Sequence, residues 1–135
     1  MNVREWFRIL GWNKERTLMA LHRITGWGLT LFIVGHIVFV HEVRYGSYVW
    51  NSLLAIDESV LGKVLLVVIM MALIFHGLNG IRIMLIESGH LLTKPKEQEY
   101  PYTTWLTGKR HQTYVMIMGV IGIVLTIVAG LVIFS

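Results

Sequence analysis

The sequence predicts an all-α integral membrane protein with three transmembrane helices and a short N-terminal interfacial helix. Hydrophobic residues make up 55% of the 135 residues, and charged residues only 15%. Soluble domains carry about 25% charged residues. The apolar residues also gather into three long runs, each close to or above the ~20 residues that a helix needs to cross a bilayer. One domain, residues 1–135, accommodates all of them.

The three apolar runs give the expected spans in chain order. The second run follows Asp57-Glu58-Ser59, a pattern typical of a helix start, where acidic groups lie near the positive end of the helix. The third run carries no charge beyond its first residues. We expect transmembrane helices at 17–41, 59–87 and 111–134, with a link at 88–110.

The segment 1–16 precedes the first span and is amphipathic. Trp6, Ile9 and Leu10 fall on one helical face between charged residues, which favours a short helix lying in the membrane interface. The segment lacks the apolar stretch and the small-residue cleavage site of a secretory signal. We therefore expect no cleavable signal peptide.

The basic residues predict the orientation, because Lys and Arg gather on the cytoplasmic side of membrane proteins. Ten of the twelve Lys and Arg residues lie in the N-terminal segment, in the link between the second and third spans, or at the span ends next to them. Only Arg44 and Lys63 lie toward the opposite side. The N-terminus and the 88–110 link are therefore expected in the cytoplasm, and the C-terminus outside. The ten are Arg4, Arg8, Lys14, Arg16, Arg23, Arg82, Lys94, Lys96, Lys109 and Arg110.

Composition also excludes some kinds of site. The chain has no cysteine, so it offers no disulfide, zinc thiolate or iron–sulfur ligand of its own. The net charge of +4 is modest and the basic residues avoid the apolar runs, which favours topology and membrane-surface roles over nucleic-acid binding.

Two histidines fall inside the expected spans, His36 in the first and His76 in the second. Ionisable residues at membrane depth are costly and usually functional. Neutral imidazole is a good iron ligand, and a bis-histidine haem needs one such group on each face. Both histidines are therefore candidate haem ligands. Hydrogen bonding to a neighbouring helix is the alternative.

The depths of the two histidines indicate separate sites. His36 follows Arg23 by 13 residues, about 20 Å, whereas His76 precedes Arg82 by 6 residues, about 9 Å. Histidines that differ in depth by about 10 Å should not share one iron. We expect two haems, an inner one at His76 and an outer one at His36. The helix expected at 111–134 offers no buried histidine, so another chain is expected to supply each second ligand.

At the inner end of the first span, His22 adjoins Arg23. A cation at this boundary can pair with a haem propionate or a quinone carbonyl. An arginine that extends its charge to the interface without binding a cofactor is the alternative.

The segments 21-LHRITG-26 and 75-FHGLNGIR-82, followed by 83-IMLIESGHL-91, resemble the membrane-anchor cytochrome b subunit of succinate dehydrogenase, or succinate:quinone oxidoreductase. The resemblance covers about half the chain, and the third span matches only in being hydrophobic. It implies a prokaryotic cytoplasmic membrane protein bound to a second membrane-anchor subunit, an iron–sulfur subunit and a flavoprotein subunit.

The resemblance also implies roles for individual residues. The histidine matching His76 ligates haem b, together with a histidine of the second anchor subunit. The arginine matching Arg23, with its neighbour His22, lies near the propionates and the quinone pocket, and Arg82 belongs to the same cofactor-binding set. The implied cofactors are haem b and a quinone, either menaquinone or ubiquinone.

The sequence departs from the single-haem pattern at three positions. Met19 stands where a serine typically helps to hold ubiquinone, and Ile83 stands where some members have a histidine near a propionate. His36 has no counterpart in that pattern and resembles the di-haem branch instead. Two haems would make a quinone site near the outer surface plausible, with His41, Glu42 and Arg44 as candidates for proton exchange. Solvated loop residues are the alternative there.

We therefore expect an electron-transfer anchor that holds succinate dehydrogenase at the membrane and lacks succinate oxidation activity by itself. The sequence does not separate this from the anchor of a quinol:fumarate reductase. A haem-free structural anchor is a second hypothesis. A cytochrome b of a hydrogenase or formate dehydrogenase is a third, although such chains usually carry more spans and more buried histidines.

Overall fold

The computed structural model describes residues 14–91 and 109–135, and all regular structure in them is helical. The earlier part of the expected N-terminal segment, with its interfacial helix, lies outside the described residues, as does most of the expected link. The elements are α2 (Lys14–Glu42), the 3₁₀ turn η1 (Val43–Tyr45), α3 (Ser47–Glu58), α4 (Val60–Glu87) and α5 (Lys109–Phe134).

Three of these helices, α2, α4 and α5, are long and apolar enough to cross a membrane, which confirms the all-α fold class with three spans. They contain 29, 28 and 26 residues, so each is about 40 Å long and exceeds the ~30 Å hydrocarbon layer. Their ends differ from the expected bounds by at most three residues, and the ends of α4 and α5 at residues 87 and 134 coincide with them.

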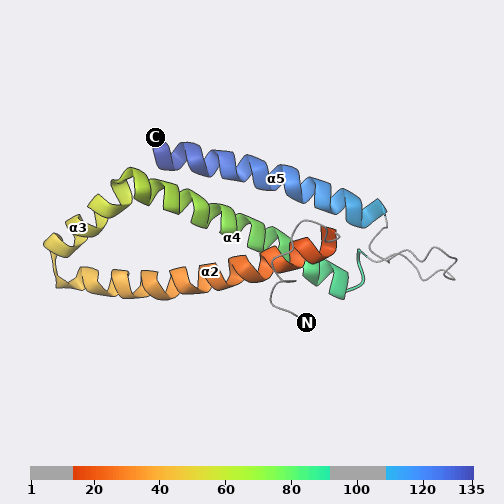
Figure 1. The fold of residues 1–135 in the computed structure, drawn as a ribbon, viewed down its shortest axis with the longest axis horizontal. Coiled ribbons are helices and arrows are strands. Elements are labelled where there is room, and N and C mark those ends of the chain that lie inside the picture. Colours follow the sequence, from red (N-terminus) through yellow and green to blue (C-terminus); the bar gives the residue numbers. More distant parts are fainter. Residues whose placement is uncertain (1–13, 92–108) are drawn as a thin grey trace, which may run out of the picture.

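The segment between the first two spans contains a helix that the sequence analysis missed. No element was expected between the spans at 17–41 and 59–87, whereas α3 occupies most of residues 42–58 and joins the far ends of α2 and α4 (Figure 1). Val49 and Leu53, four residues apart, are half-buried, while Tyr48 is exposed. Aromatic residues are typical of the membrane interface. A twelve-residue helix is too short to give the hydropathy signal of a span.

A tight turn separates α3 from α4 and confirms the helix-start signal. Ser59 caps α4 by accepting a hydrogen bond from the Gly62 backbone N–H at 3.0 Å. Gly62 is buried, and a Cβ atom there would collide with the carbonyl oxygens of Ile56 and Asp57. Only glycine therefore allows the two helices to meet at this angle.

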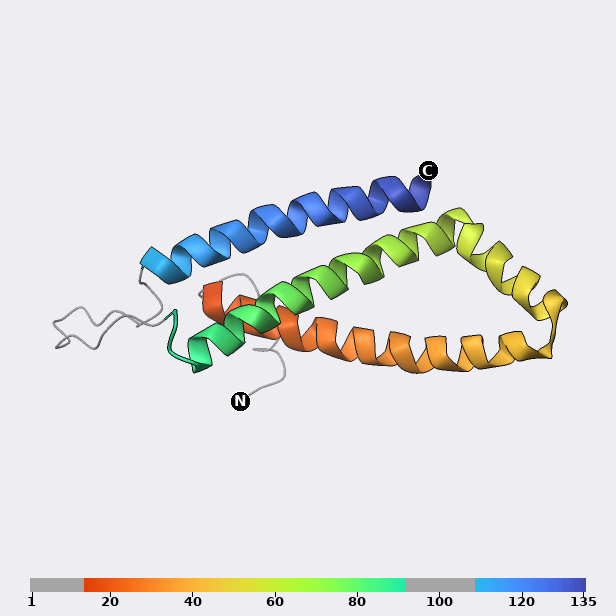
Figure 2. The same ribbon diagram turned by 180° about the vertical axis from the view of Figure 1, so that it is seen from behind.

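The helices meet closely at one end of the bundle, where α2 and α5 begin and α4 ends. We call it the inner end, after the expected orientation. Here α2 crosses α4, but toward the other end the two helices separate (Figure 2). Every α2 side chain beyond Phe32 is exposed. The part of α2 beyond Phe32 therefore lacks cover from the described part of its own chain.

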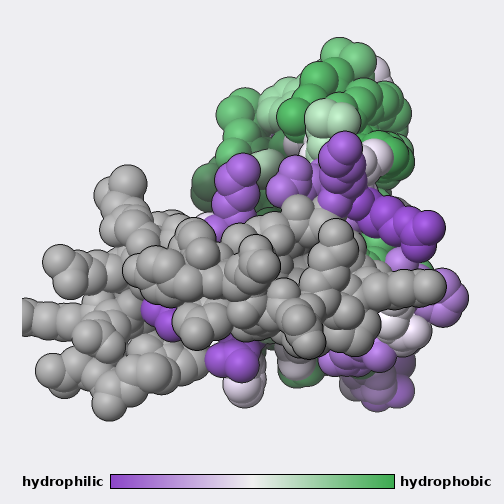
Figure 3. Space-filling view, turned by 90° about the vertical axis from the view of Figure 1, so that its right-hand side faces the viewer, coloured by the Kyte–Doolittle hydropathy of each residue, from purple (hydrophilic) through white to green (hydrophobic). Residues whose placement is uncertain are grey.

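The distribution of polarity is the reverse of that in a soluble protein. Large apolar side chains are exposed along all three spans. Hydrophilic side chains gather at the inner end, which faces the viewer in Figure 3. An apolar exterior suits a lipid environment. Among the described residues, the largest fully buried side chains are polar: Asn79, Arg82 and His111.

Candidate functional site

Two imidazole rings stack where α2 crosses α4 near the inner end. The ring centroids of His22 and His76 lie 3.9 Å apart, and the ring planes differ by 8°. Both side chains are half-buried. The crossing thus brings together two of the predicted site residues, which lie 54 positions apart in the sequence.

Glycines on the opposite helix make room for these rings. A Cβ atom at Gly26 would lie 2.9 Å from Cε1 of His76, and one at Gly80 would lie 3.5 Å from Cε1 of His22. Each glycine follows the histidine of its own helix by four residues. The two histidines and two glycines therefore form a reciprocal contact between the helices. Of the two glycines, only Gly26 lies so close to the opposite ring that an added Cβ atom would force that ring to move.

The two ring nitrogens of His76 lie in different surroundings. Its Nδ1 lies 3.1 Å from the backbone oxygen of His22 and 3.2 Å from the Oγ1 of Thr25. Its Nε2 has no hydrogen-bond partner within residues 14–91 and 109–135. The ring is thus held through Nδ1, which leaves Nε2 available to a ligand.

His22 carries a buried nitrogen that has no partner. Its Nδ1 is the one buried side-chain polar atom, among those the structure describes, without a hydrogen bond. Buried polar atoms are nearly always bonded, so an orphan calls for an explanation such as an absent ligand. The orphaned nitrogen therefore fits a cofactor or quinone that approaches this crossing.

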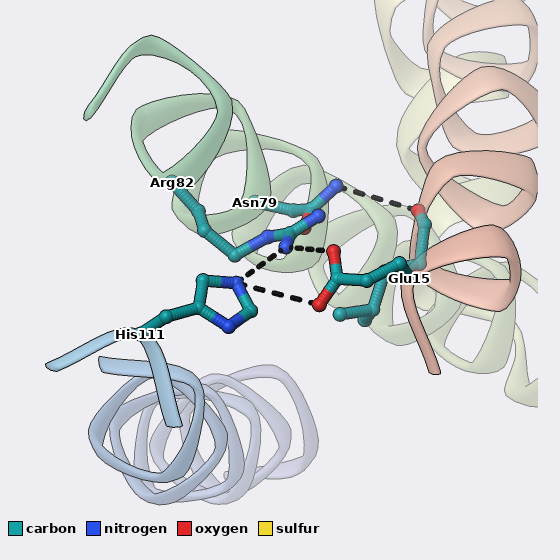
Figure 4. Close-up of polar contacts among 5 residues, drawn as sticks. Glu15, Asn79, Arg82 and His111 are labelled. Atoms are coloured by element: carbon teal, nitrogen blue, oxygen red, sulfur yellow. Dashed lines mark hydrogen bonds and ion pairs between the residues drawn. The ribbon is translucent and has the colours of Figure 1, made fainter. Parts of the chain in front are cut away.

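A second group of polar residues, which we call the Arg82 cluster, consists of Glu15, Asn79, Arg82 and His111 (Figure 4). Arg82 Nη1 donates to Glu15 Oε2 at 2.5 Å and to His111 Nε2 at 2.9 Å, and its Nε donates to Asn79 Oδ1 at 2.8 Å. His111 Nε2 also lies 3.4 Å from Glu15 Oε1. Only 1% of Arg82 is exposed. The cluster joins α2, α4 and α5.

The cluster includes three residues that the sequence analysis did not select, Glu15, Asn79 and His111. The statement that the third span offers no buried histidine is wrong, because His111 is only 2% exposed in the first turn of α5. One signal was available: Asn79 and Arg82 are three residues apart on an apolar helix, and two such groups on one face need partners. Neither Glu15 nor His111 could be matched to them by spacing.

Arg82 was predicted to contact a cofactor. In the structure its guanidinium is engaged by three side chains of its own chain, each from a different place in the sequence. A cofactor contact for Arg82 stays a prediction, and the structure adds a role in joining the helices.

His36 lies far from the stacked pair. It is exposed and stacks on Phe32, with ring centroids 5.5 Å apart. It follows His22 by 14 residues on the unbroken helix α2, a rise of about 21 Å. The expected depth difference of about 10 Å from His76 is therefore too small. It assumed that Arg23 and Arg82 lie level, whereas Arg82 bonds to Glu15, eight residues before Arg23.

The remaining predicted residues lie at the two ends of α2. Met19 and Arg23 are both exposed and, being four residues apart, share a face near the inner end. His41 and Glu42 are exposed at the other end, where the His41 ring meets Tyr45 edge to face at 6.5 Å. Arg44 donates to the Tyr45 hydroxyl at 2.7 Å. A length of helix of more than 20 Å separates the two groups.

The sequence matches the model of a known protein family. Residues 3–129 match the model of the succinate dehydrogenase/fumarate reductase transmembrane subunit. The chain belongs to this family. The family assignment confirms the resemblance that rests on the two histidine motifs. Each motif contributes one histidine, His22 or His76, to the stacked pair of this transmembrane subunit.

Two relatives of this transmembrane subunit are described as membrane subunits of succinate dehydrogenase. The succinate dehydrogenase hydrophobic membrane anchor subunit of Halobacterium salinarum is 35% identical over 71 residues, which cover 52% of this chain. The match spans about half the length of that relative, 55%. The succinate dehydrogenase 2 membrane subunit SdhC of Mycobacterium tuberculosis is 26% identical over 113 residues, 83% of this chain and 71% of that protein.

Proposed function

We propose that this succinate dehydrogenase/fumarate reductase membrane anchor binds haem b together with a second anchor subunit. It holds the flavoprotein and iron–sulfur subunits at a prokaryotic cytoplasmic membrane and passes electrons from the iron–sulfur subunit to a quinone. The family description supports the anchor role, and it names succinate dehydrogenase and fumarate reductase alike. Succinate oxidation with quinone reduction is the direction we propose, with fumarate reduction as the alternative.

The single observation that carries the haem proposal is the setting of His76. Its Nδ1 is engaged while its Nε2 has no partner in the described part of the chain, and Gly26 leaves just enough space for the ring. A neutral imidazole presented in this way is the usual axial ligand of haem iron. Haem bound here would supply one-electron transfer between the iron–sulfur subunit and quinone.

The residues of this chain would bind and orient the cofactors. His76 is the proposed inner ligand, and His22 and Arg23 provide hydrogen-bond donors for a propionate or a quinone oxygen. Quinone reduction also consumes protons, and the exposed side chains of His41 and Glu42 would exchange them at the proposed outer surface. Met19 shares the Arg23 face of α2 and would contribute an apolar contact to an inner quinone.

His36 is the proposed ligand of a second, outer haem. It is about 21 Å along α2 from His22, and one iron cannot bind both His36 and His76 across such a distance. Its exposure on an uncovered stretch of α2 is compatible with a haem shared with the second anchor subunit.

A haem-free anchor is favoured by one observation, that His76 already has hydrogen bonds across the helix crossing.

Haem quantitation of the purified complex tests the proposal. We expect pyridine haemochrome analysis to give two haems b per complex, reducible by dithionite. The substitution His76→Ala should remove one haem and leave the other, and His36→Ala should do the converse, because each loses one axial ligand. His90→Ala is the matched control, since His90 is exposed and, among residues 14–91 and 109–135, bonds only to Ser88.

The outcomes separate the alternatives. A complex without a b-type spectrum would establish the haem-free anchor. Loss of the same single haem in both His36→Ala and His76→Ala would contradict two separate centres. A haem content that falls equally in His90→Ala would show that the effects are not specific to the ligands.

A further inference from the structure

We propose that Thr25 and the backbone carbonyl of His22 fix the tautomer of His76, with the proton on Nδ1, so that Nε2 presents its lone pair to iron. Thr25 is thereby a positioning residue, since it acts through His76 and does not itself touch a cofactor. The tautomer follows from contacts within the chain, and its consequence for haem rests on the proposed function.

The His22 carbonyl decides which ring nitrogen carries the proton. A carbonyl oxygen can only accept a hydrogen bond, and it lies 3.1 Å from His76 Nδ1. If Nδ1 were unprotonated, two lone pairs would face each other in an apolar setting. A doubly protonated ring would place a full charge at membrane depth, which is costly. The neutral ring with the proton on Nδ1 is the form that satisfies this contact.

Thr25 reinforces the same choice. Its hydroxyl oxygen lies 2.8 Å from the Leu21 carbonyl and 3.1 Å from the His22 carbonyl, and it is the donor in both contacts because a carbonyl oxygen can only accept. The oxygen then has free lone pairs at 3.2 Å from His76 Nδ1, where it accepts. Both neighbours of Nδ1 are therefore acceptors. The proton on Nδ1 is shared between them, and Nε2 is left with its lone pair.

This arrangement has a chemical consequence for ligation. An imidazole whose distal N–H donates to strong acceptors is a more basic ligand, and its ring orientation is fixed. A more basic axial ligand favours the oxidised form of iron. Thr25 should therefore lower the midpoint potential of the haem bound at His76 as well as hold the ring in place.

The first test compares three threonine variants in the purified complex. Thr25→Val removes the hydroxyl but keeps the branched shape, so the midpoint potential of the inner haem should shift in the positive direction. Thr25→Ser restores the hydroxyl and should restore the wild-type potential. Thr30→Val is the matched control, because Thr30 makes the same kind of bond to Gly26, four residues earlier, without approaching His76. An unchanged potential in Thr25→Val, or an equal shift in Thr30→Val, overturns the proposal.

A second test measures the tautomer without haem. The full chain, labelled with ¹⁵N-histidine and reconstituted in lipid nanodiscs without haem, should show His76 protonated at Nδ1, with the signal assigned by its loss in His76→Ala. Protonation at Nε2 in the wild-type chain would overturn the inference, whatever the haem content. A protonated Nδ1 in a complex that binds no haem would instead refute the proposed function and leave the tautomer assignment standing.

Discussion

His76 packs against the backbone of α2 at Gly26, and this one glycine sets how closely the imidazole approaches. The stacked neighbour His22, the Thr25 hydroxyl and the His22 carbonyl all depend on that approach. The ring is thereby confined on one face by another ring and at Nδ1 by two acceptors. A ligand held in this way is preorganised, and small changes around it are felt as changes in cofactor binding.

We predict that Gly26→Ala weakens haem binding about tenfold, because a methyl group 2.9 Å from Cε1 must displace the His76 ring. Tenfold corresponds to about 1.4 kcal/mol, within the range for overpacked sites. A haem titration of the haem-depleted complex measures it. Gly28→Ala should have no effect, since no atom of the described residues lies within 4 Å of its Cβ position. Equal affinity in Gly26→Ala would mean that the ring does not depend on this contact.

At the scale of the helices, the Arg82 cluster joins the three spans where they begin and end. Helix association in lipid has little hydrophobic driving force, so polar contacts contribute to it. Arg82 contributes three hydrogen bonds from one buried side chain, to residues of α2, α4 and α5. The carboxylate of Glu15 compensates its charge. The cluster therefore fixes the inner end from which α2 and α4 diverge.

We predict that Glu15→Ala lowers the free energy of unfolding by about 3 kcal/mol, because it leaves the buried Arg82 charge without a counterion. The value lies at the low end for a buried pair because Glu15 is partly exposed, 28%. Thermal or denaturant unfolding of the complex in mild detergent measures it. Glu87→Ala is the control, since Glu87 is exposed on the last turn of α4 and should change stability by less than ~0.5 kcal/mol. Similar losses in both variants would contradict a specific ion pair.

At the scale of the whole molecule, the described chain is an open, partly covered bundle. The spans converge at the inner end, whereas α2 and α4 separate beyond it and are joined again only through α3 (Figure 1). The exposed apolar side chains along all three spans need lipid or another subunit around them. This openness agrees with membership in a family whose relatives are subunits of an enzyme complex.

We predict from the charge distribution that α4 ends in the cytoplasm and that α5 ends outside. The chain has no cysteine, so single substitutions give an unambiguous test. Ser135→Cys should react with a membrane-impermeant maleimide in intact cells, whereas Ser88→Cys should react only after the membrane is permeabilised. Both serines are exposed in the structure, and neither lies within an apolar run. The reverse labelling pattern would invert the topology.

The sequence by itself determined the three spans and the family, because long apolar runs and short histidine motifs are local features. It also selected His22 and His76. It missed α3, whose twelve residues give too weak a local signal, and it underestimated the depth difference between His36 and His76.

Only the tertiary structure decided which residues face each other. Glu15 and Arg82 lie 67 positions apart and Arg82 and His111 lie 29 apart, so no local pattern links them. The physical reason is that helix crossing sets both register and depth. Where α2 crosses α4, Gly26 meets His76 and Glu15 meets Arg82, and these contacts fix which polar groups are partnered and which nitrogen is left available.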